Sequence, residues 1–230
     1  GVLVVAGPRS RDLLKKLTRA SLANEDFGWL TGQPISIGAA SCHALRVNFV
    51  GELGWELHHP IAMQTYIFDK LMEAGAEFDI KPFGIRAMGA MALEKSYRAM
   101  QREMSIEYTA YESGLDRFIK PKKDFIGKQA LLSKKEAGLG SVFATLIVDG
   151  VTDCDARGSE AIYDGNGNLA GRATQGGFGW RIGKSIALAM LKPDFAAPGT
   201  KLKIRILGDL YDATVVEESP FDPENEALRA

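Results

Sequence analysis

The stretch VFATLIV at residues 142–148 decides one half of the fold, because a short apolar run rich in β-branched residues is typical of a strand. Five similar runs follow it, separated by turn sequences such as DGNG at 164–167 and APG at 197–199. Six short strands at this spacing predict a small antiparallel barrel or sandwich. The predicted strands cover residues 142–148, 160–163, 169–174, 185–191, 201–206 and 211–217.

The chain before these strands has a mixed pattern. The opening run GVLVVA is apolar on both faces, as in a buried strand, and two further strands at 41–50 and 55–59 are joined by the glycine-rich link GELG, which suits a tight hairpin. Leucines and other apolar residues at helical spacing predict helices between and after these strands. The predicted helices cover residues 10–17, 61–75, 85–100 and, with Asp124 as the cap, 124–132.

These patterns give an α+β region followed by a β-rich domain. We place the boundary between them near Gly138, which gives a first domain at 1–138 and a second at 139–230. GGFG at 176–179 lies among the β-type runs and has no following Lys-Ser or Lys-Thr, so we interpret it as a turn and not as a phosphate-binding loop.

Composition restricts the classes of protein that fit. The chain has 230 residues, 46% of them hydrophobic, so it is long enough to bury a core. A formal charge of -1 gives no whole-molecule reason to expect nucleic acid or an anionic membrane as a partner. Its longest apolar runs are far shorter than the roughly 18–20 residues of a membrane span. Two distant cysteines outside any CxxC motif indicate a reducing compartment and no zinc site.

The most specific candidate for chemistry is Glu56, in NFVGELGWEL at 48–57. Alternation along a strand puts Glu56 on the face opposite Trp55 and Leu57, where it either faces solvent or lines a cleft. Its two side-by-side acceptor oxygens match any ligand edge with two parallel N–H donors, such as arginine or the 2-amino-pyrimidinone edge of a pterin. An ordinary exposed strand glutamate is the alternative.

Several stretches, taken together and in this order, resemble the folate-binding aminomethyltransferase family, which contains the glycine-cleavage T-protein and the C-terminal halves of dimethylglycine and sarcosine dehydrogenases. The resemblance covers nearly the whole chain, and GELGWEL and LEKSYR are closer to the dehydrogenase branch. It implies a T-protein-like α+β region and a C-terminal β-barrel. The stretches are GP at 7–8, GELGWEL at 51–57, LEKSYR at 93–98, ESGL at 112–115, DFIGKQAL at 124–131 and GKSIALA at 183–189.

The resemblance also implies a tetrahydrofolate site, in which Glu56 binds the pterin edge and Phe49 packs on the ring system. Phe49 stands where T-proteins usually have tyrosine, so it keeps the stacking area without the hydroxyl. The family's catalytic aspartate belongs to a part of the pattern that precedes Gly1, so we expect no catalytic residue in this chain. The expected donor is a methylated amine.

The whole protein is expected to be longer than this chain, because the sequence opens inside a strand-like run without an initiator Met or a signal-peptide pattern. In the dehydrogenase branch an FAD domain precedes the folate region and is its partner. No GxGxxG fingerprint follows a strand here, so we expect no FAD on this chain itself. The expected location is the cytoplasm in a bacterium, or the mitochondrial matrix in a eukaryote.

Two departures from the family pattern affect the folate tail. Met88 stands where the T-protein pattern has an arginine, and a methionine cannot pair with a folate carboxylate. We expect Arg86, two residues earlier, to substitute in part, and Tyr97 of LEKSYR completes the set of candidate cofactor-binding residues. MQRE at 100–103 also differs from the family.

Two other functions therefore stay open. One is a non-catalytic structural or assembly module on the same fold. The other is a stand-alone aminomethyltransferase or a demethylase that acts on another methylated donor. We expect no metal site, because the adjacent His58 and His59 point to opposite faces of a strand.

Overall fold

The computed structural model describes residues 1–151 and 153–230, and these divide into two compact units. Unit 1 comprises Gly1–Gly89 and Glu224–Ala230, and unit 2 comprises Ala90–Pro223. The helix α3 (Ile85–Glu94) contains the point where the chain passes from one unit to the other. The division proposed from the sequence, near Gly138, lies inside unit 2, just before the first barrel strand.

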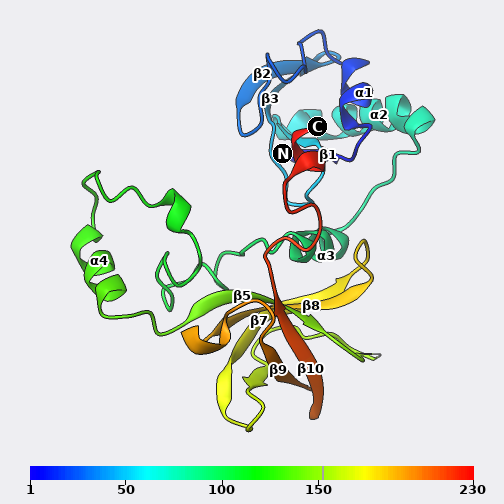
Figure 1. Cartoon of the computed structure of the whole chain (residues 1–230). Coiled ribbons are helices and arrows are strands. Elements are labelled where there is room, and N and C mark those ends of the chain that lie inside the picture. The colour runs from blue at the N-terminus through cyan, green and yellow to red at the C-terminus, as the bar shows by residue number, and fades with distance from the viewer. Residues whose placement is uncertain (152) are drawn as a thin grey trace. The chain divides into compact units, whose positions relative to one another are not determined.

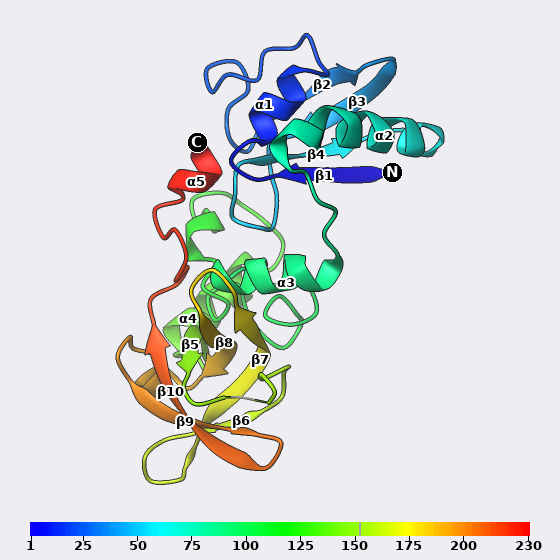
Figure 2. The ribbon, with the colours of Figure 1, turned by 90° about the vertical axis from the view of Figure 1, so that its right-hand side faces the viewer.

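Unit 1 is built on a four-stranded antiparallel sheet with the strand order β1-β4-β3-β2. The helices α1 (Ser10–Lys15) and α2 (Gln64–Gly75) run alongside the sheet (Figure 2) and contribute Leu14 and Ile67 to the core that also contains Trp55 and Leu57. This core covers one face of the sheet. The strands are β1 (Val2–Ala6), β2 (Gly32–Ile37), β3 (Ala40–Leu45) and β4 (Gly54–His58).

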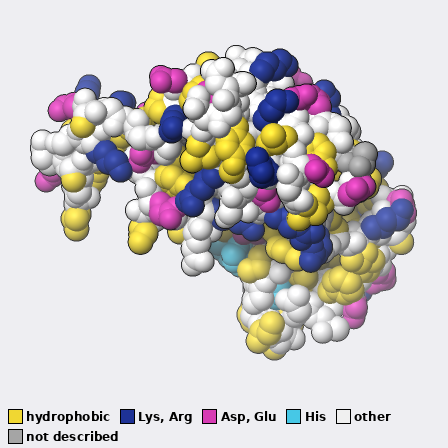
Figure 3. Space-filling view, turned by 90° about the horizontal axis from the view of Figure 1, so that it is seen from below, with side chains coloured by type: hydrophobic (Ala, Val, Ile, Leu, Met, Phe, Trp, Pro, Cys, Tyr) yellow, Lys and Arg dark blue, Asp and Glu magenta, His cyan; other side chains and the backbone are white. Residues whose placement is uncertain are grey.

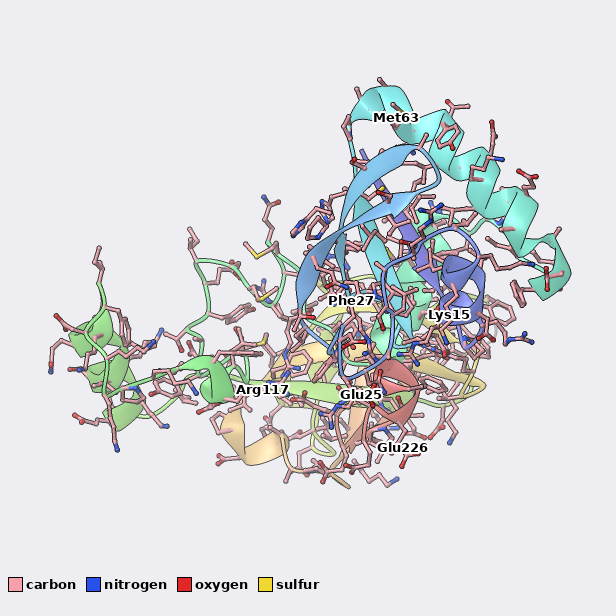
Figure 4. All side chains as sticks on the ribbon, turned by 90° about the horizontal axis from the view of Figure 1, so that it is seen from above. Lys15, Glu25, Phe27, Met63, Arg117 and Glu226 are labelled. Carbon is pink, nitrogen blue, oxygen red and sulfur yellow. The ribbon has the colours of Figure 1, made fainter. Side chains whose placement is uncertain are left out.

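Short elements complete unit 1. The 3-10 turns η1 (Ile61–Met63) and η2 (Ala76–Phe78) flank α2, and the one-turn helix α5 (Glu226–Arg229) belongs to this unit although it follows the barrel in sequence. Buried Arg46 holds the end of α5, because its guanidinium donates hydrogen bonds to the carbonyls of Arg229 and Ala230 at 3.0 and 2.9 Å. Phe27, labelled in Figure 4, packs edge-on against Trp55 in the same core.

Two strand predictions for this unit are wrong. The sequence predicted a tight hairpin at 51–54, but β3 ends at Leu45, and the pairing of Leu45 with Glu56 leaves residues 46–53 as a longer connection. The sequence also predicted a fully buried strand for GVLVVA. Instead, β1 is an edge strand with Val2 48% and Val4 36% exposed, since only one face of the sheet is covered by helices. The strand β2 was missed altogether.

The helix predictions are confirmed in position and differ in length. α1 begins as predicted but ends at Lys15, and α2 ends as predicted but begins at Gln64, because residues 61–63 form η1. α3 stops at Glu94 because Ser96 adopts a left-handed backbone conformation (φ 55°) that ends the helix. The helix α4 (Lys128–Glu136) follows Gly127 and has no side-chain cap, so Asp124 does not cap it.

Unit 2 contains a closed antiparallel barrel with the order β10-β5-β8-β7-β6-β9, so the barrel alternative is confirmed. Its core is lined by alternating apolar side chains such as Leu146, Ile162, Leu202 and Ile204. A long excursion between α3 and β5 carries the 3-10 turn η3 (Asp116–Phe118) and α4, which lies away from the barrel strands (Figure 1). The strands are β5 (Val142–Val148), β6 (Ala161–Tyr163), β7 (Leu169–Gly179), β8 (Lys184–Leu191), β9 (Lys201–Ile206) and β10 (Asp209–Val216); η4 (Pro193–Phe195) follows β8.

The glycines of GGFG are part of β7, so their interpretation as a turn is wrong. A Cβ added to Gly176 would lie 2.6 Å from the carbonyl oxygen of Ala156 and 2.9 Å from that of Ile186. Glycine is present because two neighbouring backbones approach the strand closely, which a sequence pattern does not distinguish from a turn.

Candidate functional site

Glu56 lies on β4, an inner strand of the unit 1 sheet, between Val4 of β1 and Leu45 of β3. Its neighbours Trp55 and Leu57 are completely buried in the core on the other face. Glu56 therefore projects from the face that the helices of unit 1 do not cover, as the alternation along the strand predicted. Its side chain is only 18% exposed, because the neighbouring strands flank it.

The connection at residues 46–53 fixes where β4 begins. Asn48 holds this loop through its side chain, which donates from Nδ2 to the carbonyl of Glu52 (2.7 Å) and accepts at Oδ1 from the backbone N–H of Val50 (2.9 Å). Gly54 then enters the strand where an added Cβ would lie 2.7 Å from the carbonyl oxygen of Val5. Asparagine and glycine thus set the register that brings Glu56 to its position.

Phe49 belongs to the same connection, and 56% of its surface is exposed. Arg86 lies in the first turn of α3, within unit 1, and is exposed. Three of the candidate cofactor-binding residues, Glu56, Phe49 and Arg86, thus belong to one unit. Tyr97, the fourth, belongs to unit 2.

Tyr97 is half-buried, and burial raises the pKa of its phenol, with the Asp222 carboxylate adding to the rise. The phenol therefore stays neutral well above physiological pH.

The other residues of LEKSYR hold unit 2 together. Glu94 is 1% exposed, and its carboxylate accepts from the backbone N–H of Arg181 (2.6 Å) and also pairs with the Arg181 guanidinium. Lys95, equally buried, donates to the carbonyls of Phe221 and Asp222.

Ser96 and Arg98 act in the same way. The Ser96 hydroxyl accepts from the Thr145 hydroxyl at 2.8 Å. The Arg98 guanidinium lies 3.7 Å from the centre of the Phe143 ring and forms two 2.6 Å hydrogen bonds with Glu218. This stretch joins α3, the barrel and the segment after β10 within unit 2.

The sequence reasoning missed the partner of Glu56. His58 lies two residues further along β4 on the same face, and its Nε2 is 3.0 Å from Glu56 Oε2. The signal was present, because side chains at i and i+2 of a strand share a face. His59, on the opposite face, is engaged by the Leu57 carbonyl and by Gln64 at 2.8 and 2.7 Å.

Unit 1 also has two hollows, and neither is lined by Glu56 or Phe49. One, of about 520 Å³, lies beside β1 and is lined mainly by apolar side chains, including Phe68, Met72 and Met88. The other, of about 630 Å³, lies beside the β2–β3 hairpin and includes Cys42, the pKa of whose thiol is raised by burial. The apolar hollow beside β1 and the candidate residue Glu56 are therefore separate features of unit 1.

Within the described residues, no group of three or more His, Cys, Asp or Glu side chains is arranged to hold a metal ion. The helices in the same part of the chain are all too short or too polar to cross a bilayer. On the face drawn in Figure 3, basic and acidic side chains are interspersed.

An α+β region followed by a closed antiparallel barrel is the architecture expected for an aminomethyltransferase-like protein. Comparison with known proteins identifies the family. The model of the GCVT N-terminal domain matches residues 1–123, and that of the glycine cleavage T-protein C-terminal barrel domain matches residues 142–222. The chain belongs to this glycine-cleavage T-protein family. The resemblance drawn from the sequence is confirmed.

Two groups of relatives support the dehydrogenase branch. The chain is 38% identical over 222 residues to human mitochondrial dimethylglycine dehydrogenase, covering 95% of this chain and 25% of that protein. It is 33% identical over 239 residues to mouse mitochondrial sarcosine dehydrogenase, covering 100% of this chain and 26% of that protein. The chain thus spans about a quarter of the length of these relatives.

A solved structure supports the fold. The glycine cleavage system aminomethyltransferase T from Bartonella henselae superposes with a TM-score of 0.83 at 19% sequence identity, covering 96% of this chain and 60% of that one. At this identity the similarity concerns the fold, and it confirms the predicted aminomethyltransferase-like architecture.

Proposed function

We propose that this chain is the tetrahydrofolate-binding, one-carbon transfer region of a dimethylglycine- or sarcosine-dehydrogenase-like enzyme. The observation that supports it most is the position of Glu56, a carboxylate on an inner strand, on the sheet face that the unit's helices leave uncovered. Membership of the T-protein family and the dehydrogenase relatives support the same reading.

In this proposal Glu56 accepts the two parallel N–H donors of the pterin edge, because its two oxygens lie side by side. Phe49, exposed on the connection before β4, packs on the ring system. Arg86 pairs with a carboxylate of the folate tail, since Met88 cannot. Tyr97, the fourth candidate, belongs to unit 2, and the proposal assigns it no contact with the residues of unit 1.

The residues fit tetrahydrofolate in chemical type, and the group itself would supply the nitrogen atoms that accept the one-carbon unit. This chain's residues bind and orient it. The FAD domain and the catalytic aspartate belong, in the proposal, to the rest of the polypeptide, and the donor is a small-molecule methylated amine. The proposed location is the cytoplasm in a bacterium or the mitochondrial matrix in a eukaryote.

Isothermal titration of the full-length protein with folinic acid tests the proposal. Glu56→Gln keeps the side-chain shape but replaces one acceptor oxygen by a donor amide, so we expect the affinity to fall about 10- to 100-fold, as for loss of a charge-assisted pair worth about 1.4–3 kcal/mol. Glu25→Gln, an exposed glutamate of the same unit, is the matched control. Unchanged affinity in Glu56→Gln would remove the proposal.

A second candidate, a structural or assembly module on the same fold, is favoured by one observation. Glu94, Lys95, Ser96 and Arg98 of the family-like LEKSYR stretch are all used in internal contacts. For such a module no folinic acid binding is expected in the wild type. A working site instead predicts about 2.7 kcal/mol of stabilisation at a hundredfold excess over the dissociation constant.

A third reading, a stand-alone aminomethyltransferase or a demethylase acting on another methylated donor, keeps the same binding residues. It differs in the donor and, for a stand-alone transferase, in lacking an FAD domain. Turnover assays of the full-length protein with different N-methylated amines, together with a flavin absorbance spectrum, separate it from the leading proposal.

A further inference from the structure

The uncovered face of the unit 1 sheet carries a pair of polar side chains on its inner strand β4. Glu56 and His58 are two residues apart and therefore point the same way. Across the sheet, Leu45 and His43 of β3 lie opposite them, and β1 places Val4 and Val2 on their other side. The pair is thus flanked on one side by apolar residues only.

His58 and Glu56 are in direct contact. Nε2 of the imidazole lies 3.0 Å from Oε2 of the carboxylate, a distance typical of a hydrogen bond. The histidine is the more exposed partner, with 40% of its side chain accessible against 18% for the glutamate. The imidazole is therefore in contact with the carboxylate and more accessible to solvent than it is.

We propose that His58 is a positioning residue, which donates from Nε2 to Glu56 Oε2 and holds the carboxylate in the orientation that receives the ligand. This inference rests on the proposed function of Glu56. A glutamate side chain without such a partner loses rotamer entropy when a ligand orders it, and a partner that orders it beforehand removes part of this cost.

The contact with His58 leaves Glu56 with acceptor capacity for the ligand. An ionised carboxylate has about four lone-pair sites, so one bond from His58 leaves both oxygens able to accept the N–H donors of a pterin edge. The charged and titratable side chains on this face near the pair are few. Among the described residues paired with β4, β3 contributes His43 and β1 contributes only valines at the positions opposite the pair.

The neighbouring histidines provide contrasts. His59 points into the unit, where it is 8% exposed and bonded to the Leu57 carbonyl and to Gln64, so its role is structural. His43 shares the face and lies directly opposite His58 across the strands, but its register position is two pairs away from Glu56. His43→Leu is therefore the matched control for a histidine that does not act through Glu56.

A double-mutant cycle on the full-length protein tests this, with folinic acid titrated calorimetrically. We expect His58→Leu to weaken binding about tenfold, which corresponds to about 1.4 kcal/mol. In His58→Gln the amide can still donate, so we expect its affinity to be within about threefold of wild type. In a Glu56→Gln background, His58→Leu should change nothing further. His43→Leu should match the wild type.

The outcomes separate the two proposals. If Glu56→Gln leaves the affinity unchanged, the folate site itself is refuted. If Glu56→Gln weakens binding but His58→Leu does not, only the positioning role is overturned. If His58→Leu weakens binding equally with and without Glu56, His58 acts independently of Glu56, which also overturns the role. Should His58→Leu fail to fold, His58→Ala takes its place. Wild-type affinity in His58→Ala would overturn the positioning role, whereas weakened binding in His58→Ala that His58→Gln restores would support it.

Discussion

Removing the carboxylate of Glu94 should unfold unit 2 more readily without involving any ligand. Glu94 is 1% exposed and accepts from the backbone N–H groups of Arg181 (2.6 Å) and Ile182 (3.3 Å) as well as from the Arg181 guanidinium. Glu94→Ala would leave two backbone donors and one guanidinium of the barrel unit without this acceptor.

The expected cost follows from these contacts. Leaving a buried donor unsatisfied costs about 1–3 kcal/mol, and breaking one side of a buried ion pair costs about 3–5 kcal/mol. The Arg181 side chain is 20% exposed, so water recovers part of the loss and we expect about 3–4 kcal/mol in all. That is a large share of the roughly 5–15 kcal/mol typical of a domain.

Urea unfolding measures the loss of unfolding free energy in Glu94→Ala. Because the two units need not unfold together, hydrogen exchange of barrel peptides then shows whether this loss belongs to unit 2. The double variant Glu94→Leu with Arg181→Met removes both charges and should cost less than Glu94→Ala alone. A loss below about 1 kcal/mol in Glu94→Ala, or a double variant at least as unstable as the single one, would refute this account of LEKSYR.

Three further outcomes are expected. Burial alone would raise the pKa of Glu112, but hydrogen bonds from Thr109 and the nearby Lys134 ammonium lower this pKa overall. The stabilisation by Glu112 is therefore present above the ordinary glutamate range and is lost as pH falls. The difference in stability between wild type and Glu112→Gln should shrink from pH 7 to pH 3 in urea titrations, and a constant difference would contradict this. Gly176→Ala should cost about 1–3 kcal/mol because its Cβ meets backbone oxygens, whereas Gly177→Ala meets only the tip of the Leu93 side chain and should cost less; equal thermal shifts would count against it. Arg46→Met should speed hydrogen exchange at residues 226–230, since Arg46 binds the last two carbonyls of the chain; unchanged exchange would show that Leu228 packing suffices.

The barrel was the part of the fold that sequence reasoning reached most directly. Each strand is a separate apolar run between turn residues, so its position follows from local composition, and β5 and β9 match their predicted bounds. β7 extends beyond its predicted end at Thr174, and this extension contains Gly176, where the backbone of Ala156 from another part of the unit comes close to the strand. Local patterns do not contain that information.

The candidate site was reached only in part. The face of Glu56 followed from the period of a strand, but the connection before it did not, because its length depends on the side-chain bonds of Asn48. The contacts of the LEKSYR side chains were harder to predict from the sequence. Its partners lie far along the chain, with Glu94 and Arg181 separated by 87 residues, so only the folded structure shows what these side chains contact.

The stretches that identify the family therefore have two different physical roles. GELGWEL contains Glu56, whose carboxylate lies on the sheet face that the helices of unit 1 leave uncovered, whereas LEKSYR is used within unit 2. Glu56→Gln should change ligand affinity and leave unfolding nearly unaltered, since glutamine keeps the shape of the side chain. Substitution at Glu94 should do the reverse. Family membership alone does not separate these two effects, and a pair of variants measured for both affinity and stability does.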